Sequence, residues 1–167
     1  GNLYIADRNN NRVRKVSTEG IITTVAGDGG FFFMGDNGPA YRASVAAPTG
    51  VAVDQKGNLY IADRNNNRIR VVDKLGMIRT IAGTGQQGYN GDSEVARETN
   101  LYLPFGLAIA SNDDLLVIDR SHYRIRRINP KSGKVETVAG NGLKLFAGDG
   151  GPATGATLSF PHGMVID

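Results

Sequence analysis

The stretch Gly57–Val72 reads GNLYIADRNNNRIRVV, and the rest of the chain is organised around it. Fifty-six residues earlier, Gly1–Val16 reads GNLYIADRNNNRVRKV and differs at two of sixteen positions. Fifty-six residues later the pattern returns more loosely as DDLLVIDRSHYRIRRI, Asp113–Ile128. A fixed period of this length indicates an array of like structural units, so each structural question is asked once per repeat.

Each copy of this stretch predicts a β-hairpin. An apolar run ends in aspartate, a polar tetrad follows, and an arginine opens a second alternating run. Asparagine tolerates the left-handed conformation that tight turns need, so the Asn-rich tetrad fits the turn. Each period also contains a TVAG-type strand and a short apolar strand that begins at a proline, namely Pro48–Asp54, Pro104–Ala110 and Pro161–Asp167. We therefore expect an all-β fold with four short strands per period, in one domain with repeats at about 1–54, 55–110 and 111–167.

Composition limits the possible functions. The 167 residues contain no cysteine, which excludes disulfides and thiolate chemistry, and no apolar run is long enough to span a membrane. The net charge of +3 is mildly basic, but most arginines recur at equivalent positions, which favours a structural use over a nucleic-acid patch. The composition does not fix the compartment, and we favour an extracellular or periplasmic setting over the cytoplasm.

Four strands per repeat, joined by short turns, are typical of a β-propeller blade. A β-solenoid also fits the spacing but rarely needs loops as long as 28–47. The motifs P-x-G-[VL]-A-[VI]-D, G-N-L-Y-[IV]-A-D, N-x-R-[IV]-R and T-[VI]-A-G recur in the same order in each period, and this pattern resembles the NHL repeat. The loops FMGDNGPA (33–40) and FAGDGGPA (146–153) resemble the long bacterial variety of that repeat. The third copy departs from the pattern at Asp113, Ser121, His122 and Tyr123.

The resemblance also implies a number of blades. NHL propellers usually close with six blades, whereas this chain has three periods. Three blades cannot close a ring, and open edges favour pairing. We therefore expect a homodimer that forms a six-bladed ring, in which His162–Asp167 of one copy pairs with Asn2–Asp7 of the other.

The long loops and the Asn-rich turns are expected on one face, which makes that face the candidate binding surface. Each loop repeats an aromatic residue and an acid: Phe33 with Asp36, Tyr89 with Asp92, and Phe146 with Asp149. One interpretation is a ring of contacts for a protein, peptide or glycan. The other is structural: the aromatic packs the loop on the blade, and the Asp caps the glycine turn that follows it. A calcium site would need more clustered carboxylates than a Gly-Asp-Gly supplies.

Two sets of arginines recur beside the hairpin aspartates. The pairs Asp7 with Arg12, Asp63 with Arg68 and Asp119 with Arg124 are predicted to brace each hairpin turn, because the same placement in every repeat suggests the same structural task. Arg8, Arg64 and Arg120 follow the aspartates and should point elsewhere, so they are the better candidates for contact with a partner.

The residue after each strand-opening proline should lie at the mouth of the central channel. These residues are Thr49, Phe105 and His162. Amidating lyases, which NHL repeats resemble, hold a metal in such a channel with several His and acidic ligands, whereas this chain has two histidines. We therefore expect a non-enzymatic interaction scaffold with no cofactor and no metal. A metal-dependent lyase or hydrolase is the first alternative; RNA binding is the second, and it lacks an aromatic platform among the arginines.

Overall fold

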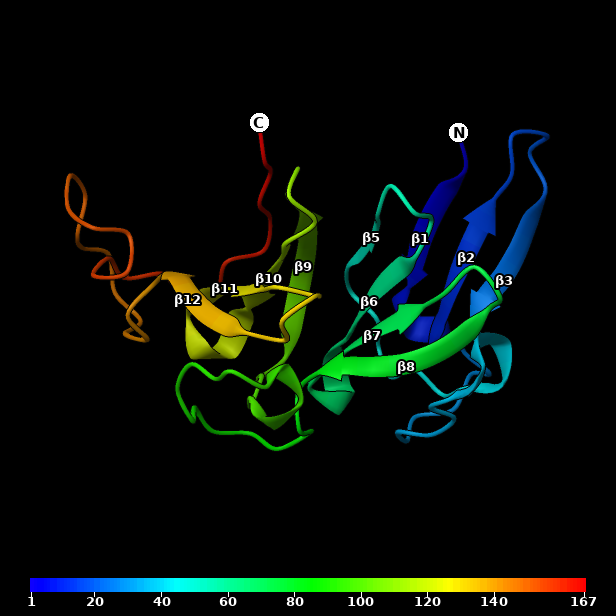
Figure 1. Ribbon diagram of the computed structural model, residues 1–167, viewed down its shortest axis with the longest axis horizontal. Helices are drawn as coiled ribbons and strands as arrows, with labels where there is room; N and C mark the ends of the chain where they lie inside the picture. Colours follow the sequence, from blue (N-terminus) through cyan, green and yellow to red (C-terminus); the bar gives the residue numbers. More distant parts are fainter.

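The computed structural model describes residues 1–167 and consists of three antiparallel sheets set side by side (Figure 1). The first sheet contains β1 (Leu3–Asp7), β2 (Arg12–Val16) and β3 (Ile22–Ala26). The second contains β5 (Val51–Val53), β6 (Leu59–Asp63), β7 (Arg68–Val72) and β8 (Met77–Ala82), with the short β4 (Gly38–Pro39) added beside β8. The third contains β9 (Pro104–Ile109), β10 (Leu115–Asp119), β11 (Arg124–Ile128) and β12 (Val135–Ala139). The all-β expectation is confirmed, and the second and third sheets each have the four meander strands of one period.

The hairpin turns are single turns of 3-10 helix, η1 (Arg8–Asn10), η3 (Arg64–Asn66) and η5 (Arg120–His122). The residue that ends each turn is left-handed: Asn11 with φ 51°, Asn67 with φ 52° and Tyr123 with φ 55°. The expected role of asparagine is confirmed in the first two copies, because its side chain tolerates this region of φ/ψ space. Two further short 3-10 segments, η2 (Ala40–Arg42) and η4 (Ala96–Glu98), lie in the long loops.

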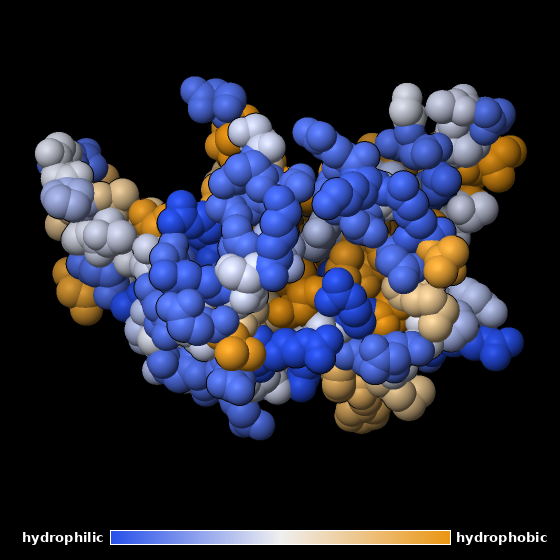
Figure 2. Space-filling model, viewed as in Figure 1, coloured by the Kyte–Doolittle hydropathy of each residue, from blue (hydrophilic) through white to orange (hydrophobic).

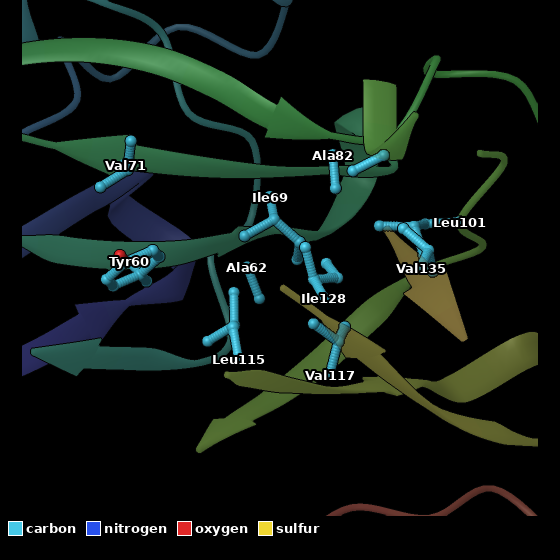
Figure 3. Close-up of a cluster of buried hydrophobic side chains, with 11 residues drawn as sticks. Tyr60, Ala62, Ile69, Val71, Ala82, Leu101, Leu115, Val117, Ile128 and Val135 are labelled. Atoms are coloured by element: carbon cyan, nitrogen blue, oxygen red, sulfur yellow. The ribbon is translucent and has the colours of Figure 1, made fainter. Parts of the chain in front are cut away.

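The blades pack face to face, because the second strand of a blade is apolar on both sides. In β6, Leu59 and Ile61 belong to the core shared with the first sheet, whereas Tyr60 and Ala62 belong to the core shared with the third. Side chains that alternate along a strand point to opposite faces of the sheet, so one five-residue run serves both interfaces. Figure 3 shows the second of these cores, where Ile69 and Tyr60 approach Leu115 and Val117.

The same five residues are buried differently in the first sheet. LYIAD occupies both β1 and β6, yet Leu59 is 4% exposed and Leu3 is 60% exposed. The local sequence is identical, so the difference comes from the neighbours: a second sheet covers that face of β6, whereas nothing covers that face of β1.

The segment Pro161–Asp167, predicted to be a strand, has no strand structure. It begins beside β9, where the carbonyl oxygen of His162 lies 3.4 Å from the Cβ position of Gly106, and it ends with Val165 92% exposed. A strand needs a hydrogen-bonding neighbour, and this segment pairs with none of the three sheets. Both chain ends lie along the upper edge of the molecule in Figure 1. None of the helical segments has the length and apolarity needed to cross a membrane.

Candidate functional site

The hairpin aspartate of the second blade is buried and accepts several hydrogen bonds. Asp63 is fully buried, and its carboxylate accepts hydrogen bonds from the backbone N–H of Ala46 at 2.7 Å and from Asn66 Nδ2 at 2.9 Å. Nη1 of Arg70 lies 3.2 Å from Asp63 Oδ2, and both side chains are completely buried. The third blade repeats the arrangement with Asp119 and Arg126, at 3.3 Å. A buried carboxylate with this many donors fixes the turn and the incoming linker together.

The prediction that Arg68 braces Asp63 is therefore wrong, because Asp63 pairs with Arg70. Arg68 stands opposite Asp63 in the hairpin register, but its Nη1 and Nη2 donate to the carbonyl oxygens of Asn66 and Thr84. Arg70 lies two residues further along the same face of the strand, and its side chain reaches back to the carboxylate. The same correction applies to the predicted pairs of Asp119 with Arg124 and of Asp7 with Arg12, because Arg124 and Arg12 also donate to backbone carbonyls.

The loop between blades covers the hairpin of the next blade. The guanidinium of Arg68 lies 3.9 Å from the ring centroid of Phe33, and Arg70 lies 4.9 Å from it. Asp36 Oδ1 lies 2.7 Å from Arg70 Nη2, and Asp36 Oδ2 accepts a hydrogen bond from the backbone N–H of Thr80 in β8. The acid thus bonds to the next blade, which corrects the structural interpretation in which it caps the glycine turn that follows it.

Tyr89 and Asp92 occupy the same place between the second and third blades. The guanidiniums of Arg124 and Arg126 lie 3.8 and 5.3 Å from the Tyr89 ring centroid, and Asp92 accepts from the backbone N–H of Thr137 at 3.0 Å. These four aromatic and acidic residues, proposed from the sequence as contacts for a partner, are therefore engaged within the array. Phe146 and Asp149 make no such contact, and Phe146 is 87% exposed.

The three channel-mouth residues lie together where the first strands of neighbouring blades meet. Thr49 Oγ1 donates to the carbonyl oxygens of Pro104 and Phe105, both at 3.1 Å. The ring of Phe105 meets the ring of His162 edge-on, with centroids 4.9 Å apart. The next residue in the motif must be glycine, since a Cβ at Gly50 would lie 2.3 Å from the Phe105 carbonyl oxygen. First strands can pack this closely only where one of them has no side chain. The structure shows no cluster of three or more His, Cys, Asp or Glu side chains suited to hold a metal.

Arg120 lies at this mouth, and Arg64 is within electrostatic range of both Arg8 and Arg120. Arg120 Nη2 lies 3.2 Å from Nε2 of His162, and its guanidinium lies 4.9 Å from the ring centroid of Phe160. Burial lowers the pKa of Arg64, and the positive charges of Arg8 and Arg120 lower it as well. None of the three forms an ion pair with a carboxylate.

The residue that sequence reasoning missed is the second arginine of each hairpin, represented by Arg14, Arg70 and Arg126. A signal was present, because R-x-R places two arginines on one face of the strand in every copy, and one of them must be buried if the face is covered. The separation from the loop aromatic to the first arginine is also constant, at 35 residues for Phe33 to Arg68 and for Tyr89 to Arg124.

Comparison with known proteins agrees with this architecture. A family model described as the Teneurin NHL domain matches residues 33–90. The human NHL repeat-containing protein 2 is 36% identical over 133 residues, covering 74% of this chain and 18% of that protein. The Arabidopsis thaliana protein SUPPRESSOR OF QUENCHING 1, chloroplastic, is 33% identical over 139 residues, covering 78% of this chain and 13% of that protein. The chain thus spans less than a fifth of the length of these curated relatives.

Solved structures show the same fold. A Bacteroides thetaiotaomicron protein of unknown function superimposes with a TM-score of 0.72 at 20% identity, over 96% of this chain and 38% of that chain. Three antiparallel sheets in this arrangement are propeller-like. The chain therefore belongs to the NHL-repeat family.

Proposed function

We propose that the chain is a non-enzymatic interaction scaffold that binds an acidic segment of a protein or peptide at the centre of the long-loop face. The observation that carries the proposal is the place of Arg120 beside His162 at the mouth, with Arg8 and Arg64 within electrostatic range and no carboxylate partner for any of the three. Other arginines of the array, such as Arg70 and Arg126, are neutralised by two aspartates each. The charge at the mouth therefore serves no ion pair within the blades.

The chemistry of these three side chains favours carboxylates. A guanidinium presents a planar fork of donors that matches a carboxylate in a bidentate pair. The Nε atoms of Arg64 and Arg120 are buried and have no hydrogen-bond partner. Mutual repulsion among three close cations is relieved when an anion binds between them. A glycan without acidic groups would gain nothing from this feature, and RNA would require aromatic faces that are free for stacking, whereas Phe105 and Phe160 contact Arg120.

The experiment is fluorescence anisotropy with a labelled peptide of alternating Glu and Ser, a matched Lys and Ser peptide, and a single-stranded RNA of similar length. We expect the acidic peptide to bind more tightly than the basic one, with an affinity that falls as salt rises. A variant with Arg8, Arg64 and Arg120 all changed to Gln should lose at least about tenfold in affinity, or about 1.4 kcal/mol.

The matched control is a variant with three other exposed arginines, Arg42, Arg79 and Arg97, changed to Gln, which removes the same charge from other positions. Equal losses in the two variants would show that net charge alone attracts the peptide, and the proposed site would be wrong. Arginine-dependent binding of the RNA without binding of the acidic peptide would replace the proposal with nucleic-acid recognition.

We further propose that two copies of the chain complete a six-bladed ring, so that six such arginines surround one mouth. The support is the shape of the array, in which β1 leaves one apolar face uncovered, with Leu3 60% exposed. Two propeller-like solved chains superimpose on 96% and 100% of this chain. This chain covers only 38% and 40% of their lengths.

A further inference from the structure

The loops between blades make the same contact twice within this chain. The loop contributes an aromatic and an acid, Phe33 with Asp36 or Tyr89 with Asp92, and we call it the donor half because it comes from the preceding blade. The next blade contributes the two arginines of the R-x-R in its hairpin and a threonine on its outer strand, and we call these residues the acceptor half. The arginines Arg68 and Arg124 lie 3.9 and 3.8 Å from the ring centroids, and the acids pair with the next arginine along, at 2.7 and 3.2 Å. This paired contact is called the latch below.

A third donor half is present and has no acceptor. Residues 146–153 read FAGDGGPA against FMGDNGPA at 33–40, so Phe146 and Asp149 stand where Phe33 and Asp36 stand. Phe33 packs on the next blade and is 39% exposed. Phe146 is 87% exposed, and Asp149 is exposed as well. Leu143 and Leu145 beside it are 58% and 65% exposed. Apolar side chains therefore gather on this loop, which extends from the array on the left in Figures 1 and 2.

A third acceptor half is also present and has no donor. The hairpin of the first blade reads NNNRVR at 9–14 where the second reads NNNRIR at 65–70. Arg14 Nη1 lies 3.7 Å from Asp7 Oδ2, and these side chains are 28% and 25% exposed, whereas those of Arg70 and Asp63 are fully buried. No aromatic ring lies over Arg12. Thr24 is the counterpart of Thr80 and Thr137, whose backbone N–H groups bond to the latch acids.

The two free halves do not meet within these 167 residues. The loop that contains Phe146 lies at one end of the row of sheets, and the first sheet lies at the other (Figure 1). We propose that the latch loop of one copy, through Phe146 and Asp149, docks on Arg12, Arg14 and the N–H of Thr24 in a second copy. This inference rests on the proposed ring of two copies and names the contact that closes it.

The acceptor surface on a second copy matches the one that Phe33 and Asp36 occupy in this chain. The acceptor surface of the first blade differs from that of the second at two of sixteen positions in Gly1–Val16, and neither change touches the arginines. The acid and the arginines have opposite charge, so the contact is complementary. The same docking would place Gly151 and Pro152 beside Ile21 and Ile22, as Gly38 and Pro39 lie beside Met77 and Ile78 in the second blade. Ile21 and Ile22 are 63% and 49% exposed, and the docked loop would cover them.

The first experiment compares two variants that carry the same pair of substitutions at equivalent positions, Phe146→Ser with Asp149→Asn, and Phe33→Ser with Asp36→Asn. Light scattering on size-exclusion fractions over a range of concentrations measures association, and urea unfolding at low concentration measures the stability of the single chain. We expect the wild type to reach about twice its mass of 17.8 kDa. The 146/149 variant should dimerise at least about tenfold more weakly, with its single-chain unfolding midpoint unchanged. The 33/36 variant should unfold at lower urea instead.

The second experiment exchanges the charges. Asp149→Arg alone and Arg14→Glu alone should each be monomeric, because each homodimer would contain two repulsive contacts. An equimolar mixture of the two variants should recover the dimer. One interface of the mixed dimer then joins the two substituted side chains, whose charges are opposite but exchanged, and the other keeps the original pair of Asp149 and Arg14. Circular dichroism of each variant checks that it is folded.

The outcomes separate this inference from the proposals on which it rests. A wild type that stays monomeric at all concentrations overturns both the ring and the latch, while peptide binding at the arginines is tested independently. A dimer that the 146/149 substitutions leave intact, or a charge-exchanged mixture that stays monomeric, overturns the latch and leaves the ring standing.

Discussion

Asp63 forms its buried ion pair with Arg70 and not with Arg68, the residue directly opposite it in the hairpin. The choice is set by the loop from the preceding blade, because Asp36 and the carbonyl oxygen of Met34 receive the other end of the same guanidinium. Arg70 therefore ties three segments together: its own hairpin, the incoming linker through Ser44, and the loop above.

Arg70→Met should be far more damaging than Arg68→Met. The first change leaves the fully buried Asp63 without its cation, which typically costs about 3–5 kcal/mol. The second removes two hydrogen bonds to backbone carbonyls and the contact with Phe33, for about 1–2 kcal/mol. Urea unfolding of both variants measures the difference. A larger loss for Arg68→Met would favour the brace that the sequence predicts.

Gly50→Ala should destabilise the contact between the second and third blades. The new Cβ would lie 2.3 Å from the carbonyl oxygen of Phe105, so the first strands must separate. Overpacking of this kind costs about 1–3 kcal/mol. Gly163→Ala is the control within the same motif, because no atom lies within 4 Å of its Cβ position, and the stability of the single chain should not change. Equal effects of the two substitutions in thermal unfolding would contradict the assigned strand contact.

Tyr60 should make the stability of the second blade sensitive to alkaline pH. Burial, followed by the charge of Asp54 and the hydrogen bond that Asp54 accepts at 3.2 Å, raises the pKa of the Tyr60 hydroxyl from 10.0 to about 12. The folded state therefore favours the neutral phenol. Its contribution is fully present below pH 10 and is lost as the pH rises toward 12, because the unfolded chain ionises first.

Tyr60→Phe isolates this contribution. The phenylalanine loses the hydrogen bond to Asp54, for about 1 kcal/mol at neutral pH, but has no group to ionise. The stability advantage of the wild type, measured by urea unfolding at about pH 8, 10 and 11.5, should shrink as the pH rises. Lysine ionisation is common to both proteins and cancels in the difference. An advantage that stays constant or grows with pH would contradict the shifted pKa.

Asn67 should be needed for both its conformation and its side chain. Its φ is 52°, its Oδ1 accepts from the backbone N–H of Leu103 at 2.9 Å, and its Nδ2 donates to the carbonyl oxygen of Gly85. Asn67→Gly keeps the conformation and loses the two hydrogen bonds, at about 1–2 kcal/mol. Asn67→Ala adds the left-handed strain and should cost about 1 kcal/mol more. Unfolding midpoints that rank alanine above glycine would show that conformation contributes nothing.

Local features of the fold could be predicted from the sequence, because they depend on neighbouring residues. The hairpins, the left-handed Asn11 and Asn67 and the strand at Leu59–Asp63 follow from alternation and turn chemistry. The exposure of Leu3 could not be predicted in this way, since LYIAD gives no indication of whether another blade covers the strand.

Contacts between blades were harder to predict, because they join residues far apart in the chain. The sequence identified Phe33 and Asp36 as a recurring pair but not their partners, which lie about one blade away. It identified Arg8, Arg64 and Arg120 as separate from the braces, and the structure adds that Arg64 lies within electrostatic range of the other two. That proximity depends on the angle between blades, which no single repeat encodes.

Each loop with an aromatic and an acid packs on the following blade, and this arrangement affects how such arrays can change length. Donor and acceptor lie in different repeats but at a fixed phase of the 56-residue period. A duplication or deletion of one whole period, starting at any residue, therefore copies or removes one donor and one acceptor together. The array can grow or shrink by blades without creating an unmatched surface, whereas an insertion that breaks the period separates Asp36 from Arg70 and exposes a buried charge.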